Sequence, residues 1–243
     1  MSPVLVNPSR FATPPSGSTW ATEIAADSPI LWWRLGEASG TTAADASGHS
    51  NTGTYQGSPT FGTTGLISGD TDTAVTFDGV DDRVISGTGI SGYPSAAVTI
   101  ECAFKLTAVN VQQVLLARSD VDAGFGTNWS FYLFVNSAAS LRAAFFYGSN
   151  LREVFSSALS ANTKYVVAAR ADSSSTDLWV NGSQVSTTFG LGANLNSNSI
   201  PVTVGDWYQS GPDHNRAKGV IDEALIFPTK LSNTRLSAHY AAS

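Results

Sequence analysis

Carboxylate pairs are the first residues in this sequence that could perform chemistry, because retaining glycosidases cleave sugars with two carboxylates about 5 Å apart. Their strand pattern, glutamate-x-aspartate-x-x-glutamate, is absent. The nearest approach is Asp120-Val121-Asp122, which lies in a turn-like run and has no third acidic partner. The adjacent pairs Asp81-Asp82 and Asp222-Glu223 would point to opposite faces of an extended strand. The sequence therefore predicts no catalytic residues and no enzyme.

The sequence also lacks the residues that zinc binding or nucleophilic catalysis would need. The three histidines, His49, His214 and His239, are scattered, and Cys102 is the single cysteine. Zinc sites need four ligands at close spacing. No nucleophile motif accompanies the many serines. We expect these histidines to be structural or superficial, and Cys102 to be a small apolar core residue.

Calcium is the metal ion for which the chain offers suitable ligands, since this hard cation binds six to eight oxygen atoms. Two runs are rich in oxygen: one holds Asp70 and Asp72, the other Asp78, Asp81 and Asp82. The alternative is that these carboxylates cap turns by accepting bonds from nearby N–H groups. The alternative is favoured, because the spacing does not by itself define a cage. No cofactor is certain, and calcium is the one to test.

Exposed aromatic residues would be needed for sugar binding, because pyranose rings stack on them. Trp207 and Tyr208 lie in a polar loop and are the first candidates, followed by Trp129 and Tyr147. Packing inside the protein is the alternative for Trp129 and Tyr147, and for Trp207 the two interpretations are balanced. The other tryptophans singled out, Trp32, Trp33 and Trp179, are expected in the core.

The elements that must position these residues are strands. Only 13% of the 243 residues are charged, and Gly, Ser, Thr and aromatic residues are plentiful, a composition typical of short strands joined by turns. In the run 98–106, apolar residues alternate with Glu101 and Lys105, which predicts one core face and one wetter face. About a dozen such runs predict two packed sheets. They are 30–35, 74–79, 83–86, 98–106, 114–118, 130–136, 141–148, 154–157, 164–172, 176–182, 183–189, 201–207 and 219–227.

Turn and helix signals complete the pattern. Asn181-Gly182 predicts a two-residue hairpin turn, because both residues tolerate a positive φ. A short helix is expected after Ser18 or Thr19, ending before Pro29. A closing helix is expected after Pro228, with Ser232 as its N-cap. We divide the chain into an extended arm, residues 1–17, and one sandwich domain, residues 18–243.

Charge and hydropathy exclude several partners. The net charge of −6 and the lack of a basic cluster argue against nucleic acid. No apolar run has the length of a membrane helix. The first residues lack the basic and apolar segments of a secretory signal. A lone cysteine fits folding in a reducing cytosol.

Several runs resemble the laminin-G-like jelly-roll domains, which are relatives of the concanavalin-A-like lectins and glucanases. They are WWRLGEASGTTAADASGHSNTGTY, AVTFDGVDDRVI, VTIECAFKL, KYVVAARADSSSTDLWVNGSQV and GVIDEALIFPTKLSNTRLSAHYAA, which occur in the family's order over about residues 30 to 242. The resemblance implies an all-β, two-sheet antiparallel jelly-roll sandwich with a short C-terminal helix. It also implies a calcium ion at one edge of the sandwich. Arg235 departs from the acidic residue that the family often has after the helix cap, so the cap should be weaker.

The arm suggests where the domain belongs. The run VNPSRFA resembles the opening of tailed-phage structural proteins in which an arm precedes a laminin-G-like domain. This implies a virion protein on a capsid or tail, present in several copies and adhering to glycans. Purely architectural cementing and a soluble carbohydrate-binding module are the alternatives. The anchoring residues would be Val6, Asn7, Pro8, Arg10 and Phe11.

Overall fold

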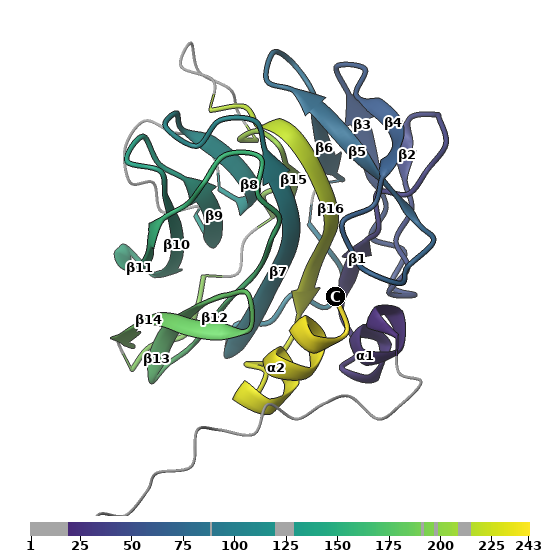
Figure 1. The fold of residues 1–243 in the computed structure, drawn as a ribbon. Helices are drawn as coiled ribbons and strands as arrows, with labels where there is room; N and C mark the ends of the chain where they lie inside the picture. The colour runs from purple at the N-terminus through teal and green to yellow at the C-terminus, as the bar shows by residue number, and fades with distance from the viewer. Residues whose placement is uncertain (1–18, 88, 120–128, 191, 197–198, 209–214) are drawn as a thin grey trace, which may run out of the picture.

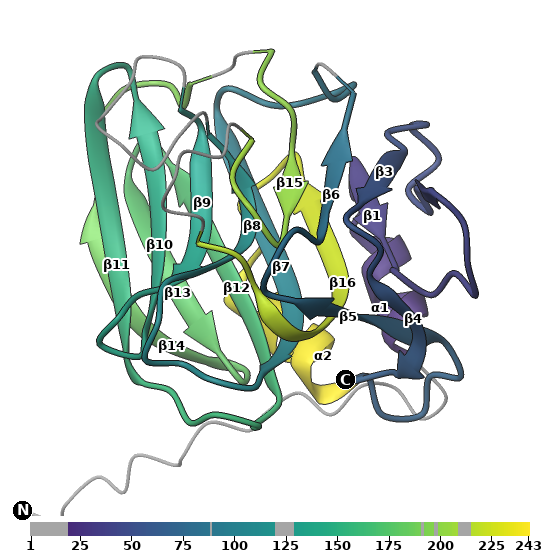
Figure 2. The same cartoon turned by 90° about the horizontal axis from the view of Figure 1, so that it is seen from above.

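Two antiparallel β-sheets pack face to face in the computed structural model, which describes residues 19–87, 89–119, 129–190, 192–196, 199–208 and 215–243 (Figures 1 and 2). Sheet A has the strand order β14-β13-β12-β7-β16-β5-β4, with β1 paired to β16. Sheet B has the order β11-β10-β9-β8-β15-β6-β3-β2. This architecture, closed by one short C-terminal helix, confirms the predicted all-β jelly-roll sandwich.

The elements follow one another along the chain as α1 (Trp20–Ala26), β1 (Leu31–Trp33), β2 (Thr42–Ala43), β3 (Gly53–Gln56), β4 (Thr60–Thr64), β5 (Thr73–Asp78), β6 (Arg83–Ser86), β7 (Ala97–Leu106), β8 (Gln113–Arg118), β9 (Phe131–Val135), β10 (Ser140–Tyr147), β11 (Asn150–Ala158), β12 (Tyr165–Asp172), β13 (Ser175–Val180), β14 (Ser183–Phe189), β15 (Thr203–Val204), β16 (Lys218–Phe227) and α2 (Asn233–Ala241).

Strands β7 and β16 form the middle of sheet A and pair along most of their length. Alternate residues from Val98 to Leu106 point into the main core between the sheets, as their period of two predicts. The opposite face of β7 was expected to be wetter, and for Glu101 this was wrong. Glu101 is buried because His239 of α2 lies against it. Sheet A is therefore covered on both sides at this point.

Helices α1 and α2 lie next to each other at one end of the molecule (Figure 1). Their apolar residues, including Trp20 and Leu236, join a second core on the outer face of sheet A. Helix α1 begins at the cap Thr19 and ends before Pro29, and α2 begins at the cap Ser232, as predicted. Within the described residues, no helix has the length and apolar character needed to span a bilayer.

The predicted hairpin turn joins β13 to β14. Asn181 and Gly182 have φ values of 48° and 73°, the positive values that such a turn requires. Gly182 is also required for space, because a Cβ atom there would lie 2.4 Å from the Tyr240 ring. The turn thereby fits closely under the end of α2.

Candidate ligand-binding sites

The aromatic residues expected to bind sugar pack against one another on the outer face of sheet B. Trp129 and Trp207 stack with ring centroids 6.4 Å apart, and Tyr132 meets Trp207 edge-on at 5.6 Å. Trp129 and Trp207 are each only 5% exposed. A side chain this deeply buried offers no face for a sugar ring, so the prediction of an exposed platform was wrong for both. Their apolar area is used in packing instead.

The two predicted tyrosines have different surroundings. Tyr147 lies in the main core, where its hydroxyl donates to the Asp172 carbonyl at 2.8 Å, and burial raises its pKa. It cannot stack on a sugar from that position, so this prediction was also wrong. Tyr208 is half-buried. Sugar binding by Tyr208 stays a prediction.

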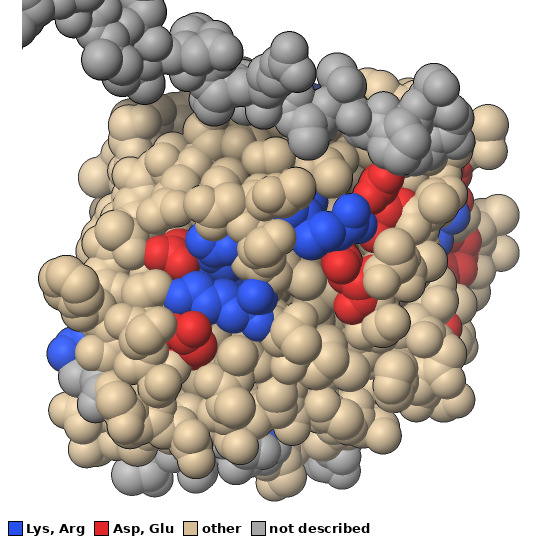
Figure 3. Space-filling view, turned by 90° about the horizontal axis from the view of Figure 1, so that it is seen from below, with Lys and Arg blue, Asp and Glu red and all other residues tan. Residues whose placement is uncertain are grey.

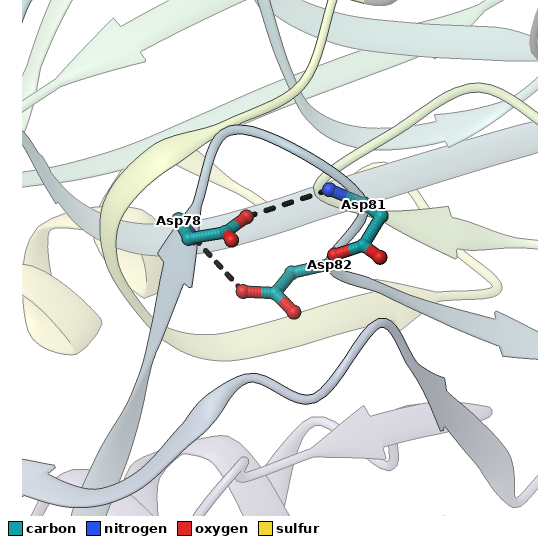
Figure 4. A group of neighbouring side chains, drawn as sticks. All are labelled: Asp78, Asp81 and Asp82. Atoms are coloured by element: carbon teal, nitrogen blue, oxygen red, sulfur yellow. Dashed lines mark hydrogen bonds between the residues drawn. The ribbon is translucent and has the colours of Figure 1, made fainter.

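The turn between β5 and β6 brings together Asp78, Asp81 and Asp82, whose carboxylates have oxygens within 4.8 Å of one another (Figure 4). Asp78 accepts from the Val80 N–H at 2.7 Å, and Asp82 accepts from the Asp78 N–H at 2.9 Å. These are the turn-capping bonds of the alternative interpretation. Burial and the two neighbouring carboxylates raise the pKa of Asp82. Oxygens remain free for an ion, so calcium binding here stays a prediction.

Arg83 connects this turn to the Trp207 segment. Its Nη1 atom donates to the Trp207 and Tyr208 carbonyls, each at 3.2 Å. The acidic turn and Tyr208 therefore lie at the same end of the sandwich. No local pattern predicts this proximity, because about half the chain separates the two segments.

The other predicted calcium ligands, Asp70 and Asp72, are bound to a guanidinium. Arg34 Nη2 lies 2.6 Å from Asp70 Oδ2, and Arg34 Nε lies 3.1 Å from Asp72 Oδ2. Glu223 Oε1 completes the group, 3.2 Å from the same Nε. A positive group at the centre of these carboxylates takes the place of a cation, so the calcium prediction for Asp70 and Asp72 was wrong. Arg34 was not among the residues predicted to form a site.

Asp222 and Glu223 do not point to opposite faces as expected of an extended pair. A β-bulge interrupts β16 here, and Glu223 has a φ of 57°. Both carboxylates therefore reach the outer side, where Asp222 accepts from the Leu66 N–H and Glu223 from the Trp32 indole. Burial raises the pKa of Asp222 to about 6, and burial with the Asp222 charge raises that of Glu223 to about 8. Both carboxylates are closed off from solvent, which gives them a structural role.

A cavity of about 340 Å³ opens beside Arg34, between the start of α1 and the loop before β5. Polar groups line much of it, including Arg34 and Asp70, and Arg34 is 28% exposed. Trp20 also lines it, and the buried Trp20 indole nitrogen has no hydrogen-bond partner within the described part of the chain. The remaining lining residues are Thr19, Ala21, Ser68, Gly69, Thr71 and Ala242. The site offers both donors and acceptors to a small polar ligand.

Ion pairs also join the two helices near this cavity. His239 contacts Glu101 through Nδ1 at 3.0 Å and Asp27 through Nε2 at 2.9 Å, so both ring nitrogens donate and the ring is charged. Burial opposes that charge, but the two carboxylates outweigh it and raise the pKa to about 9. Arg235 adds pairs with Asp27 and Glu23 of α1. On the face seen in Figure 3, basic and acidic groups adjoin and form no extended patch of one sign.

Comparison with solved structures shows the same fold in a neurotoxin receptor-binding domain and in a sialidase module. The receptor-binding domain of a botulinum neurotoxin mosaic serotype C/D superimposes with a TM-score of 0.67 at 14% identity, covering 89% of this chain and 51% of the toxin domain. A sialidase module, CBM40, from Ruminococcus gnavus bound to α2,3-sialyllactose gives 0.51 at 20% identity, covering 60% and 82%. This chain thus spans about half the length of the neurotoxin domain. No curated protein sequence matches it significantly.

The family comparison agrees with the fold. The profile of the concanavalin A-like lectin/glucanases superfamily, in its laminin-G type, matches residues 78–237. That segment runs from the acidic turn after β5 into α2, and so includes most of both sheets. The chain belongs to the concanavalin A-like lectin/glucanases superfamily.

Proposed function

We propose that the domain is a non-enzymatic glycan-binding module and that the cavity beside Arg34 is its sugar site. The cavity itself carries the proposal. Its volume of about 340 Å³ falls within the range of small-molecule sites. Sugar hydroxyls both donate and accept hydrogen bonds, which suits a site lined by Arg34, Asp70 and the hydroxyl residues Ser68 and Thr71.

The similar structures support this function. The Ruminococcus gnavus module was solved with α2,3-sialyllactose, and a neurotoxin DC binding domain was solved in complex with SialylT. At 20% and 13% identity these relatives share the fold alone. The aromatic face of sheet B is the less suitable location in this chain, because its indoles are already packed.

A glycan array probed with the full chain tests the proposal. The variant Thr71→Trp places a large side chain at the exposed rim of the cavity. Thr54→Trp makes the same change at an exposed position on β3 of the other sheet. We expect bound glycans, with binding lost in Thr71→Trp and kept in Thr54→Trp. A silent array would favour a purely architectural role, and equal binding by both variants would place the sugar elsewhere.

We further propose that the module is carried on the particle of a tailed phage. The VNPSRFA run in the arm supports this origin. Its residues Val6, Asn7, Pro8, Arg10 and Phe11 lie outside the described part of the chain. Capsid decoration and tail attachment remain the two locations, with glycans at the host surface as the outward partner.

Deletion of residues 1–17 tests the virion proposal. Particles assembled with the shortened chain should lack it, while the isolated domain should keep its unfolding midpoint. Unchanged incorporation would contradict an anchoring role for the arm. A chain never found on particles would favour a soluble carbohydrate-binding module.

A further inference from the structure

The charges around the cavity are unbalanced. The guanidinium of Arg34 contacts three carboxylates, those of Asp70, Asp72 and Glu223. Because burial raises the pKa of Glu223 to about 8, this group is largely uncharged at neutral pH. Two carboxylates against one guanidinium still leave a negative charge.

The positive charge of Arg34 is therefore already countered by its own carboxylates. Its Nε and Nη2 atoms are already bound to carboxylates. Asp70, which lines the cavity, is 18% exposed and would lie close to any ligand there. The hydroxyl residues Ser68 and Thr71, both exposed, add neutral donors and acceptors to the lining.

We infer that the cavity binds uncharged sugars and discriminates against sialylated ones. This inference rests on the proposed function and names the ligand class of the same site. A sugar hydroxyl can donate to the Asp70 carboxylate and exchange hydrogen bonds with the hydroxyl groups of Ser68 and Thr71. The carboxylate of a sialic acid can donate no hydrogen bond to Asp70, and like charges at contact distance in a partly buried site repel strongly. The site thus differs in ligand class from the Ruminococcus gnavus module solved with α2,3-sialyllactose.

Glycan pairs that share one neutral core and differ only in a terminal sialic acid test the inference. The full chain is titrated with the neutral core that the array shows to bind best, and with its sialylated counterpart. We expect the sialylated glycan to bind at least about tenfold more weakly, the effect of one unfavourable charge contact.

Two variants should reduce the difference in affinity between the neutral and the sialylated glycan. Asp70→Asn removes one negative charge and keeps the shape of the side chain. Ser68→Lys adds a positive charge at an exposed rim position that makes no buried contact. Asp81→Asn is the matched control, since it removes an exposed aspartate from the turn between β5 and β6 and should leave the difference unchanged. The Ser68→Lys variant keeps the test valid even where Asp70→Asn weakens the fold.

The outcomes separate the inference from the proposed function. Equal or tighter binding of the sialylated glycan overturns the inference alone. The inference also fails if Asp81→Asn changes the difference in affinity between the two glycans and the two cavity variants do not. An array without any bound glycan overturns the proposed function and the inference together. A preference for the neutral member that both cavity variants reduce is the result we expect.

Discussion

The outer faces of the two sheets differ: aromatic residues are packed together on that of sheet B, whereas polar residues line a cavity on that of sheet A. On sheet B, Trp129, Trp207 and their aromatic neighbours fill the face with ring contacts. On sheet A, the helices leave a cavity beside Arg34, which is lined by Arg34, Asp70, several hydroxyl residues and the Trp20 ring. Residue types alone would have placed the ligand on sheet B. Exposed surface and available hydrogen-bonding groups are therefore better indicators of a candidate binding site than residue type.

The largest effect should come from the packed face. Trp207→Ala removes a buried indole, so the free energy of unfolding should fall by about 3 to 5 kcal/mol, measured by chemical denaturation. Val80→Ala is the control, because Val80 is exposed, and it should change stability by less than about 0.5 kcal/mol. A stable Trp207→Ala variant that loses glycan binding would reverse the comparison and restore Trp207 as a ligand platform.

The next largest effect on stability is expected from the charged residues on the outer face of sheet A. Arg34→Ala leaves Asp70, Asp72 and Glu223 without their cation, and we expect a loss of about 2 kcal/mol in denaturant unfolding. The value is smaller than for a fully buried pair because Arg34 is partly exposed. Adding Asp72→Asn to Arg34→Ala should recover part of the loss, since it removes one of the carboxylates left without a cation. No recovery would mean that Arg34 acts through packing on Trp32 instead.

Stability should fall as pH rises. The folded pKa of His239 is raised to about 9, so its contribution is complete below the unfolded value of about 6.5 and is lost as pH rises through about 9. The folded pKa of Glu223 is raised to about 8, so its ionisation also destabilises the fold in the window from about 4.3 to 8. We expect a loss of about 2 kcal/mol between pH 6 and 9.5, measured by urea denaturation at each pH.

Two variants assign that slope. His239→Gln should flatten the upper part of the profile, and Glu223→Gln the lower part. A profile that stays steep in both variants would mean that neither group controls the pH dependence of this face.

The smallest effect is expected at the acidic turn. Asp78→Ala loses its bonds from the Val80 and Asp81 N–H groups and should cost about 1 kcal/mol in thermal or chemical unfolding. Millimolar calcium, added to both proteins, separates the two roles of the turn. Calcium that stabilises the natural chain but not Asp78→Ala would assign an ion site, whereas no effect on either would leave turn capping as its role.

The fold could be predicted because its signals are local. The alternation in β7, the Asn181-Gly182 turn and the cap at Ser232 each depend on a few neighbouring residues. The pairing of sheets followed from the number of such strands. Arg235 shows what local signals cannot predict. The absence of a reciprocal capping bond was predicted, but the ion pairs of Arg235 with Glu23 and Asp27 join residues about 210 positions apart.

The site could be predicted only in part, since exposure and charge balance depend on distant partners. Asp78, Asp81 and Asp82 lie together because one turn contains them all. Asp70 and Asp72 lie together as their spacing predicts, but the cation that they bind is Arg34, which comes from another segment. The β-bulge at Glu223, which turns both carboxylates to one side, has no signature such as glycine at that position. Trp207 stands in a polar run and is nonetheless buried.

A crystal structure of the full chain with its best-bound glycan tests the central claim most directly. We expect the sugar in the cavity lined by Trp20, Arg34 and Asp70, with a hydroxyl within hydrogen-bond distance of the Asp70 carboxylate. A sugar bound instead on sheet B, over Tyr208 or the Trp129 and Trp207 rings, would contradict it.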